Sequence, residues 1–493
     1  MKYKNYIAII LIGSFLSSCS DFLEPAPSSS LTTSNYFTTA AELETGLLGV
    51  YDAIQGSSDR DRDLNHGVQY EFYVTEMRSD NTSSKTPDSE DASDAGQFEN
   101  YTLRSTNLFV RDYYSSYFQV IYRANVILGS LGVVTDPDQA AAIEAEAKFL
   151  RGYAYFNLVR LFGDLPLIDR VISPTETEIQ FTRVDKNLIY DLIVSDLETA
   201  VAGVTGTSKN RASKAAAKSL LAKVYLSLES PEYLKAQVLC EEVINSSSPA
   251  LSLQSNFYNV FYSEGNSEVI WAIGYQAGLD GESQLFSSEW LNAVGVSSGV
   301  NYATTDVKAA LDAMGGNRTQ YSYRLDPLTV TGTNRYQVTK YLPEGNTGGV
   351  NGNVFPGTPR NAGNDWIVLR LSDVLLMHVE AIMGSANETQ ADAALISFNK
   401  VRSRAGMPTK TLGVDKIEKA ELLDERRVEL AFENHRFFDL LRFKAAQSVL
   451  QAYSDANNFD FQSTDLLLPI PQNEINLSRS SGTEMYQNPG FLQ

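Results

Sequence analysis

Apolar residues recur at spacings of three and four over much of the chain, which is the period of an amphipathic helix. The predicted helices of the first half are Ala40–Ile54, Phe109–Leu131, Ala140–Phe162, Lys186–Ala202, Arg211–Leu228 and Pro231–Asn245. The stretch GDLP, from Gly163 to Pro166, ends the third of these helices with glycine and then proline. The pattern predicts a mainly α-helical protein.

Consecutive helices form pairs joined by short turns. In the pair Arg211–Leu228 and Pro231–Asn245, Ala216 and Ala222 are small enough for close contact between the helices. Two further predicted pairs are Arg370–Gly384 with Thr389–Ala405, and the segment from Lys416 to Leu450. Recurring pairs of this kind indicate a tetratricopeptide-like partial solenoid, although the spacing between the pairs is irregular.

The pattern changes between about residues 251 and 365. Gly, Asn, Ser and Tyr become frequent, and short alternating pieces replace the helical period. The pieces SEVIWAIGYQ and NRYQVTKYLP are candidate strands within long loops. Because loops on a rigid frame commonly carry binding surfaces, we expect the ligand-binding region to lie in this loop-rich part.

The N-terminus predicts an export signal. The first 19 residues, MKYKNYIAIILIGSFLSSC, begin with two lysines and continue with an apolar run that is too short to span a membrane. The segment Leu16 to Cys19 resembles a bacterial lipobox, in which the cysteine is acylated after cleavage. We therefore predict a signal peptide (1–18), a polar tether (19–34) after lipidated Cys19, and a single domain (35–493). The alternative is an ordinary secretory signal that contains a cysteine.

Composition excludes several classes of protein. The formal net charge of −20 argues against nonspecific nucleic-acid binding. Two cysteines provide neither a disulfide framework nor a cysteine-rich zinc site, and Cys240 is expected to be a buried structural thiol. No phosphate-binding glycine motif, nucleophile elbow or H-E-x-x-H zinc motif occurs, so we predict no cofactor and no metal. The acidic segment Pro87 to Asp94 lacks the EF-hand spacing and is expected to be a solvated loop.

The stretch ERRVELAFENHRFFDLLRF, Glu425 to Phe443, is dense in charge and could be an active site or an ionic framework. Arg427 falls on the apolar stripe of the predicted helix and should be buried and paired. Arg436 is three residues from both Glu433 and Asp439, a spacing that favours ion pairs on one helix. Asn434 tolerates the left-handed conformation, so the helix can break there. The predicted structural ion-pair network is Arg427, Glu429, Glu433, Arg436 and Asp439.

Seven segments together resemble the SusD/RagB family of Bacteroidetes outer-membrane lipoproteins. In chain order they are SSCSDFLEP, EAKFLRGYAYFNLVRLFGDLPLI, WIVLRLSDVLLMHVEAI, FNKVRSRAGM, ELLDERRVELAFENHRFFDLLRF, LLLPIPQNEI and QNPGF. The resemblance implies tetratricopeptide-like helix pairs and a variable loop-rich part. It also implies a protein without enzymatic activity that acts as a lid on a TonB-dependent SusC-like transporter, lipid-anchored at the outer membrane and facing the exterior.

The resemblance implies a nutrient ligand, either a glycan or, in the RagB branch, an oligopeptide. Sugar binding needs aromatic rings for the apolar sugar face and polar groups for the hydroxyls. The candidate ligand-binding residues are Tyr70, Tyr73, Arg78, Asp80 and Asn81, and in the loop-rich part Trp290, Asn301, Tyr302, Tyr321 and Tyr323. Asp80 and Asn81 could instead form a helix-capping turn. Trp271 and Trp366 are expected in the core. A surface hydrolase is the alternative from another class, and no motif supports it.

Overall fold

The computed structural model describes residues 36–56, 65–84, 94–247, 250–279, 281–289, 301–325, 335–341 and 361–491. The predicted signal peptide and tether, Cys19 and Trp290 lie outside these ranges. Most of the acidic segment from Pro87 to Asp94 also lies outside them.

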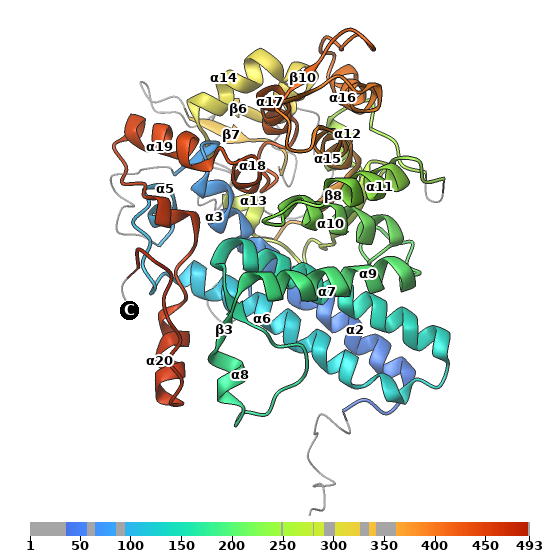
Figure 1. Ribbon diagram of the computed structural model, residues 1–493, viewed down its shortest axis with the longest axis vertical. Coiled ribbons are helices and arrows are strands. Elements are labelled where there is room, and N and C mark those ends of the chain that lie inside the picture. The colour runs from blue at the N-terminus through green and yellow to red at the C-terminus, as the bar shows by residue number, and fades with distance from the viewer. Residues whose placement is uncertain are drawn as a thin grey trace, which may run out of the picture.

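Four long helices form the base of the fold: α2 (Ala40–Gln55), α6 (Leu108–Gly129), α7 (Pro137–Phe162) and α9 (Lys186–Gly203). In chain order, each packs against the next, as the lower half of Figure 1 shows. Residues at the helix starts stabilise the first turns. Thr39 forms a capping box with Glu42 at the start of α2, and Asp136 caps α7 just before its first-turn proline. All four were predicted from the apolar period.

The solenoid continues through α10 (Lys214–Ser227), α11 (Tyr233–Ile244), α15 (Leu371–Met383) and α16 (Asp392–Arg404). The helix α9 packs on α10, α10 on α11, α11 on α15, and α15 on α16. The contact between α11 and α15 brings together segments that more than a hundred residues of chain separate, and Figure 1 shows them side by side. The predicted mainly α-helical fold of stacked helix pairs is confirmed.

The segment from Lys416 to Leu450 differs from the predicted pair. It forms three short helices, α17 (Lys419–Glu429), α18 (Arg436–Arg442) and α19 (Ala446–Asn457). Between the first two, Phe432 and Asn434 have left-handed backbone conformations with φ of 67° and 62°. The predicted helix break at Asn434 is therefore confirmed, since α17 ends before it and α18 begins after it.

The loop-rich part contains both predicted strands. SEVIWAIGYQ contains β4 (Val269–Ile273), which pairs antiparallel with β8 (Trp366–Arg370), and NRYQVTKYLP contains β7 (Tyr336–Val338). Trp271 and Trp366 are 0% and 4% exposed, so both are core residues as expected. A four-stranded sheet has the order β1 (Thr82–Ser83), β5 (Tyr302–Ala303), β7 and β6 (Tyr323–Leu325).

The remaining elements are short. The helical ones are η2 (Gly67–Tyr70), α3 (Glu71–Val74), η3 (Glu76–Arg78), α5 (Gly96–Glu99), η4 (Leu131–Val133), α8 (Thr177–Phe181), α12 (Tyr258–Tyr262), α13 (Phe286–Glu289), α14 (Thr305–Met314), η5 (Gly316–Tyr321), η6 (Ser463–Leu466) and α20 (Gln472–Ser480). The strands are β2 (Leu165–Pro166), β3 (Arg183–Val184), β9 (Glu388–Thr389) and β10 (Ile417–Glu418). Within the described ranges, none of the helices combines the length and the apolar character that a membrane crossing requires.

Cys240 lies on α11 and is fully buried. Burial raises the pKa of its thiol, so the protonated form is favoured at neutral pH. The expectation of a structural thiol is confirmed.

Candidate functional site

The charged stretch from Glu425 to Phe443 forms a buried ionic core. Glu429 lies between three arginines: Arg318 at 2.8 Å, Arg370 at 2.6 Å, and Arg404 in direct contact. All four side chains are at most 3% exposed. Burial alone would raise the pKa of Glu429, but Arg404, Arg370 and Arg318 together hold it well below its usual value. The Glu429 carboxylate is therefore saturated by cations, which suits a framework role better than acid or base catalysis.

The same core joins the loop-rich part to the helices. Lys340 Nζ is 2.6 Å from Glu433, and Arg370 Nε is 2.7 Å from the same carboxylate. Arg318, at η5, also contacts Glu425 at 2.7 Å. Arg318 and Lys340 belong to the loop-rich part, whereas the glutamates follow or lie on α17. The partners were missed from the sequence because each is isolated there, and only folding gathers them.

The other predicted members of the network, Asp439, Arg427 and Arg436, also form ion pairs. The partner of Arg436 differs from the one predicted. Arg426 Nε contacts Asp439 at 2.9 Å, and Arg427 contacts Asp306 at 2.7 Å. Arg436 was expected to pair with Glu433 or Asp439, but its partner is Asp80 at 2.8 Å. The local spacing was misleading because both carboxylates are bound by other cations. Glu433 lies before α18 and pairs with Arg370 and Lys340, and Asp439, on α18 with Arg436, pairs with Arg426 and Arg442.

The predicted ligand patch around Tyr70 to Asn81 lies in the core. The exposed fractions are 4% for Tyr70, 2% for Tyr73, 0% for Arg78, 4% for Asp80 and 0% for Asn81. Tyr73 stacks on Phe109, and the Arg78 guanidinium lies over the Phe437 ring. Side chains this buried offer a ligand almost no surface. The expectation of an exposed binding face here is therefore wrong, because α6 and α18 cover the segment.

Two further candidates are buried and two reach the surface. Asn301 and Tyr302 are 0% and 2% exposed, and Arg335 lies over the Tyr302 ring. Tyr321 and Tyr323 are half-buried at the surface near the β6 edge of the four-stranded sheet. Of the candidates that the structure describes, only these two therefore keep a ring partly open to solvent.

Tyr336 and Lys308 complete a surface cluster with Tyr323. The rings of Tyr323 and Tyr336 meet edge to face at 5.6 Å, and Lys308 Nζ lies 5.5 and 5.2 Å from their centroids. Tyr323 donates its hydroxyl hydrogen bond to Asp312, which also pairs with Lys308 at 2.6 Å. The tyrosine patch is defined as Tyr321, Tyr323, Tyr336, Lys308 and Asp312. Tyr336 could have been found from the alternation in NRYQVTKYLP.

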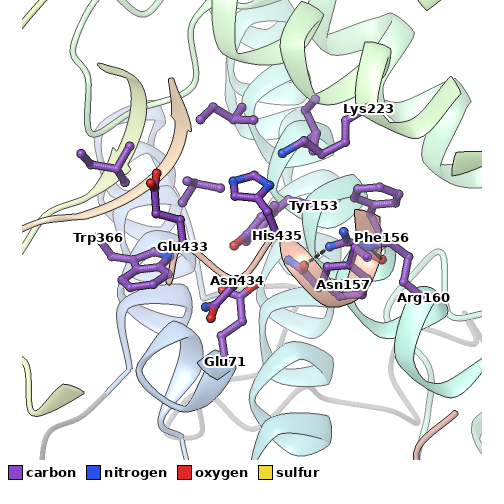
Figure 2. Close-up of a pocket in the computed structure, with 15 residues that line it drawn as sticks. Glu71, Tyr153, Phe156, Asn157, Arg160, Lys223, Trp366, Glu433, Asn434 and His435 are labelled. Carbon is purple, nitrogen blue, oxygen red and sulfur yellow. Dashed lines mark hydrogen bonds between the residues drawn. The ribbon is translucent and has the colours of Figure 1, made fainter. Parts of the chain in front are cut away.

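A small internal cavity of about 40 Å³ lies between α7, β8 and the segment from Glu433 to Phe438. Figure 2 shows Glu71 and Asn434 side by side in it, with His435 above them and Arg160 bonded to Asn157. Burial raises the pKa of Glu71 to about 7 and lowers the pKa of His435 to about 3. The cavity has room for a few water molecules and is far too small for a sugar ring.

No group of three or more His, Cys, Asp or Glu side chains within the described ranges is placed to hold a metal ion. The glutamates of the ionic core instead pair with arginine and lysine. The described residues thus form an ionic framework with an aromatic cluster at the surface.

Comparison with known proteins agrees with the family resemblance that the seven sequence segments indicate. A family model described as "SusD family" matches residues 289–491, and one described as "Starch-binding associating with outer membrane" matches residues 21–226. The chain belongs to the SusD-like family. The SusD-like protein P2 of Formosa agariphila is 28% identical over 99% of this chain and 100% of its own length.

Solved structures agree with this SusD-like assignment. A "Laminarin binding SusD-like protein" has a TM-score of 0.74 at 25% identity and covers 92% of this chain and 100% of its own. Surface glycan-binding protein A from Bacteroides thetaiotaomicron, in complex with laminarihexaose, has a TM-score of 0.73 at 21% identity. It likewise covers 92% of this chain and 100% of its own, and at that identity the likeness concerns the fold.

Proposed function

We propose that this SusD-like protein is a surface lipoprotein that captures oligosaccharides or polysaccharides. It acts as the lid of a TonB-dependent SusC-like transporter in the outer membrane and performs no chemistry on its ligand. The proposal is supported by the family and by the laminarin-binding relative, which is similar over 92% of the chain. The saturated carboxylates of the ionic core also argue for a binding protein over a hydrolase.

The tyrosine patch is the structural feature that best supports a glycan as the ligand. Sugar rings have an apolar face that packs on aromatic rings, and hydroxyls that need donors and acceptors. Tyr323 and Tyr336 supply two adjoining rings, while Lys308 and Asp312 supply a donor and an acceptor at their edge. The patch lies on α14, β6 and β7 of the loop-rich part. Trp290, which lies outside the described residues, stays a candidate from the sequence.

The lipoprotein anchor is part of the proposal. Residues 1–18 are removed as a signal peptide, and Cys19 carries the lipid. Residues 19–34 then form a polar tether that holds the domain of residues 35–493 away from the membrane and facing the exterior. More than one acyl chain is needed for stable attachment, which bacterial lipoprotein processing supplies.

Binding assays with the full chain in detergent test the proposal. We expect it to retain labelled polysaccharides such as laminarin, to leave them uncleaved, and to ignore a mixture of oligopeptides. Tyr323→Ala and Tyr336→Ala should each weaken glycan retention roughly tenfold, the effect of losing a stacked aromatic. Tyr122, a 52% exposed tyrosine on α6, is the matched control, and Tyr122→Ala should leave retention unchanged.

The alternatives give different results in the same assay. Retention of peptides alone would assign the oligopeptide lid role of the RagB branch in place of the glycan role. Cleavage of either ligand would assign a hydrolase. Equal loss of retention in Tyr122→Ala and Tyr323→Ala would contradict the tyrosine patch as the binding site.

A further inference from the structure

A second, larger pocket of about 700 Å³ lies where the ends of several helices meet. It is lined by the C-terminal end of α7, the start of α9, the turn between α10 and α11, and the region of α17 and α18. The charged residues of its lining are Arg160, Lys186, Lys419, Arg442, Lys444 and Glu229. Five cations and one acid face this basic pocket, although the chain as a whole has a net charge of −20.

Arg160 lies at the wall between this basic pocket and the internal cavity. Its guanidinium is sandwiched between the rings of Phe156 and Phe438, 3.9 and 3.6 Å from their centroids. It donates hydrogen bonds to the Phe156 carbonyl and to Asn157, as Figure 2 shows for the second. Among the residues that the structure describes, no carboxylate lies within ion-pairing distance of it.

An unpaired guanidinium in a largely buried position is costly unless an anion approaches it. Burial lowers the pKa of Arg160, and Glu71, across the internal cavity, is the carboxylate that opposes this effect. Glu71 is a weak counter-charge, because burial raises its own pKa to about 7. The positive charge of Arg160 is therefore left for a group that enters the basic pocket.

Lys419 and Lys444 are also without a carboxylate partner in the described part of the chain. The Lys419 ammonium instead lies 5.7 Å from the Phe443 ring. Lys444 has a left-handed backbone with φ of 58°, a conformation that lysine rarely adopts. Such outliers often mark functional positions, and this one holds a cation at the edge of the basic pocket.

The other two cations contribute less to the basic pocket. Lys186 Nζ is 3.5 Å from Glu229 at the surface. Arg442 is already neutralised by Glu380 at 2.6 Å and Asp439 at 2.8 Å. Within the described ranges, the charges in the lining that no carboxylate pairs with are thus those of Arg160, the half-buried Lys419 and the exposed Lys444.

We propose that the basic pocket binds a sulfate or phosphate group, free or carried on a sugar. The Arg160 guanidinium and the two lysine ammonium groups are donors of the kind that bind a tetrahedral oxyanion. The volume is within the range of small-ligand sites, and Tyr190 and Tyr233 offer rings beside the cations for a sugar. The site is separate from the tyrosine patch and does not depend on the proposed glycan role.

Calorimetric titration of the full chain tests this site, with glucose 6-sulfate, glucose 6-phosphate, glucose and sodium sulfate at constant ionic strength set by sodium chloride. We expect the anionic ligands to bind and glucose not to bind. Lys419→Gln and Lys444→Asn should each weaken binding roughly tenfold, the effect of losing a charged hydrogen bond. Asparagine is chosen at position 444 because it tolerates the left-handed backbone.

The exposed Lys400 on α16 is the matched control, since Lys400→Gln removes the same charge outside the basic pocket. Binding weakened equally by Lys400→Gln, or unchanged in both pocket variants, overturns the proposal, as does equal binding of glucose. Equal affinity for free sulfate and glucose 6-sulfate supports it and assigns recognition to the oxyanion alone. Arg160→Met should abolish binding, and if it unfolds the chain by circular dichroism, the two lysine variants decide.

Discussion

Arg436 binds Asp80 through two parallel hydrogen bonds, Nε to Oδ1 at 2.8 Å and Nη2 to Oδ2 at 2.9 Å. The two residues are 356 positions apart, and their side chains are only 6% and 5% exposed. Arg427 reaches the same carboxylate at 2.9 Å. Asp80 therefore joins the turn after η3 to both α17 and α18.

Asp80→Ala should destabilise the protein strongly. Burial alone would raise the pKa of Asp80, but Arg436 and Arg427 hold it below its usual value, so the carboxylate is charged at neutral pH. Removing it leaves two guanidinium groups without their shared counter-ion, which costs about 3–5 kcal/mol. Urea unfolding measures this as a lower free energy of unfolding. The surface pair of Lys416 and Glu388, whose side chains are 44% and 52% exposed, is the control, and Glu388→Ala should not move the unfolding midpoint measurably.

Arg427→Ala should lower the melting temperature and leave glycan affinity unchanged in the folded protein. Arg427 is 10% exposed and contacts Asp80, Asp306 and Asn81, so its loss removes ties between α14, α17 and the η3 turn. We expect a loss of about 2 kcal/mol, because Asp80 keeps Arg436. Thermal unfolding and glycan titration of the same sample measure both quantities. Reduced affinity at unchanged stability would place Arg427 in a binding site and contradict the framework role.

Replacing Asn434 with glycine should change stability little, whereas replacing it with alanine should destabilise the protein. The Asn434 φ of 62° is accessible to glycine without strain, whereas a β-carbon without a polar group costs about 1 kcal/mol there. Asn434→Ala should therefore lower the free energy of unfolding in urea by about that amount, and Asn434→Gly by less. Asn434 also hydrogen-bonds the Glu71 side chain. Asn458, with φ of 59° at the exposed end of α19, therefore serves as the control for backbone strain alone. A much larger effect of alanine at 434 than at 458 would assign the difference to that contact.

Glu71 should make stability fall as pH rises from about 5 to 8. Burial raises its folded pKa to about 7 from 4.5, so between these values the folded protein binds more protons than the unfolded chain. Its stabilising contribution is fully present below the unfolded pKa and is lost as pH rises through 7. Glu71→Gln should remove this dependence, a change of about 1–3 kcal/mol between pH 5 and 8.

Unfolding curves of the wild type and Glu71→Gln across pH 5–8 measure the effect as a difference. The difference is needed because His435, whose pKa burial lowers to about 3, acts in the opposite direction below pH 6.5. Parallel stability curves for the two proteins would show that Glu71 is charged throughout the range.

The long helices were predictable because their information is local. In α2, Leu43, Leu47, Val50 and Ile54 lie on one face, and the cap residues mark the start. The break at Asn434 was predictable for the same reason, since a single residue type favours that backbone conformation. The partner of Arg436 was not, because local spacing carries no information about a carboxylate that folding brings from the other end of the chain.

The order of the helices, the two candidate strands of the loop-rich part and the seven family segments were all present in the sequence by itself, and they determined fold class and family. Tertiary structure decided which charged and aromatic residues are buried. Tyr70, Tyr73 and Arg78 looked like a ligand face, but Phe109 and Phe437 cover them. Tyr323 was a candidate from the sequence, but its contact with Tyr336, and the lack of a carboxylate partner for Arg160 within the described ranges, emerged only from packing. Burial depends on what lies above a side chain, and that neighbour is usually distant in sequence.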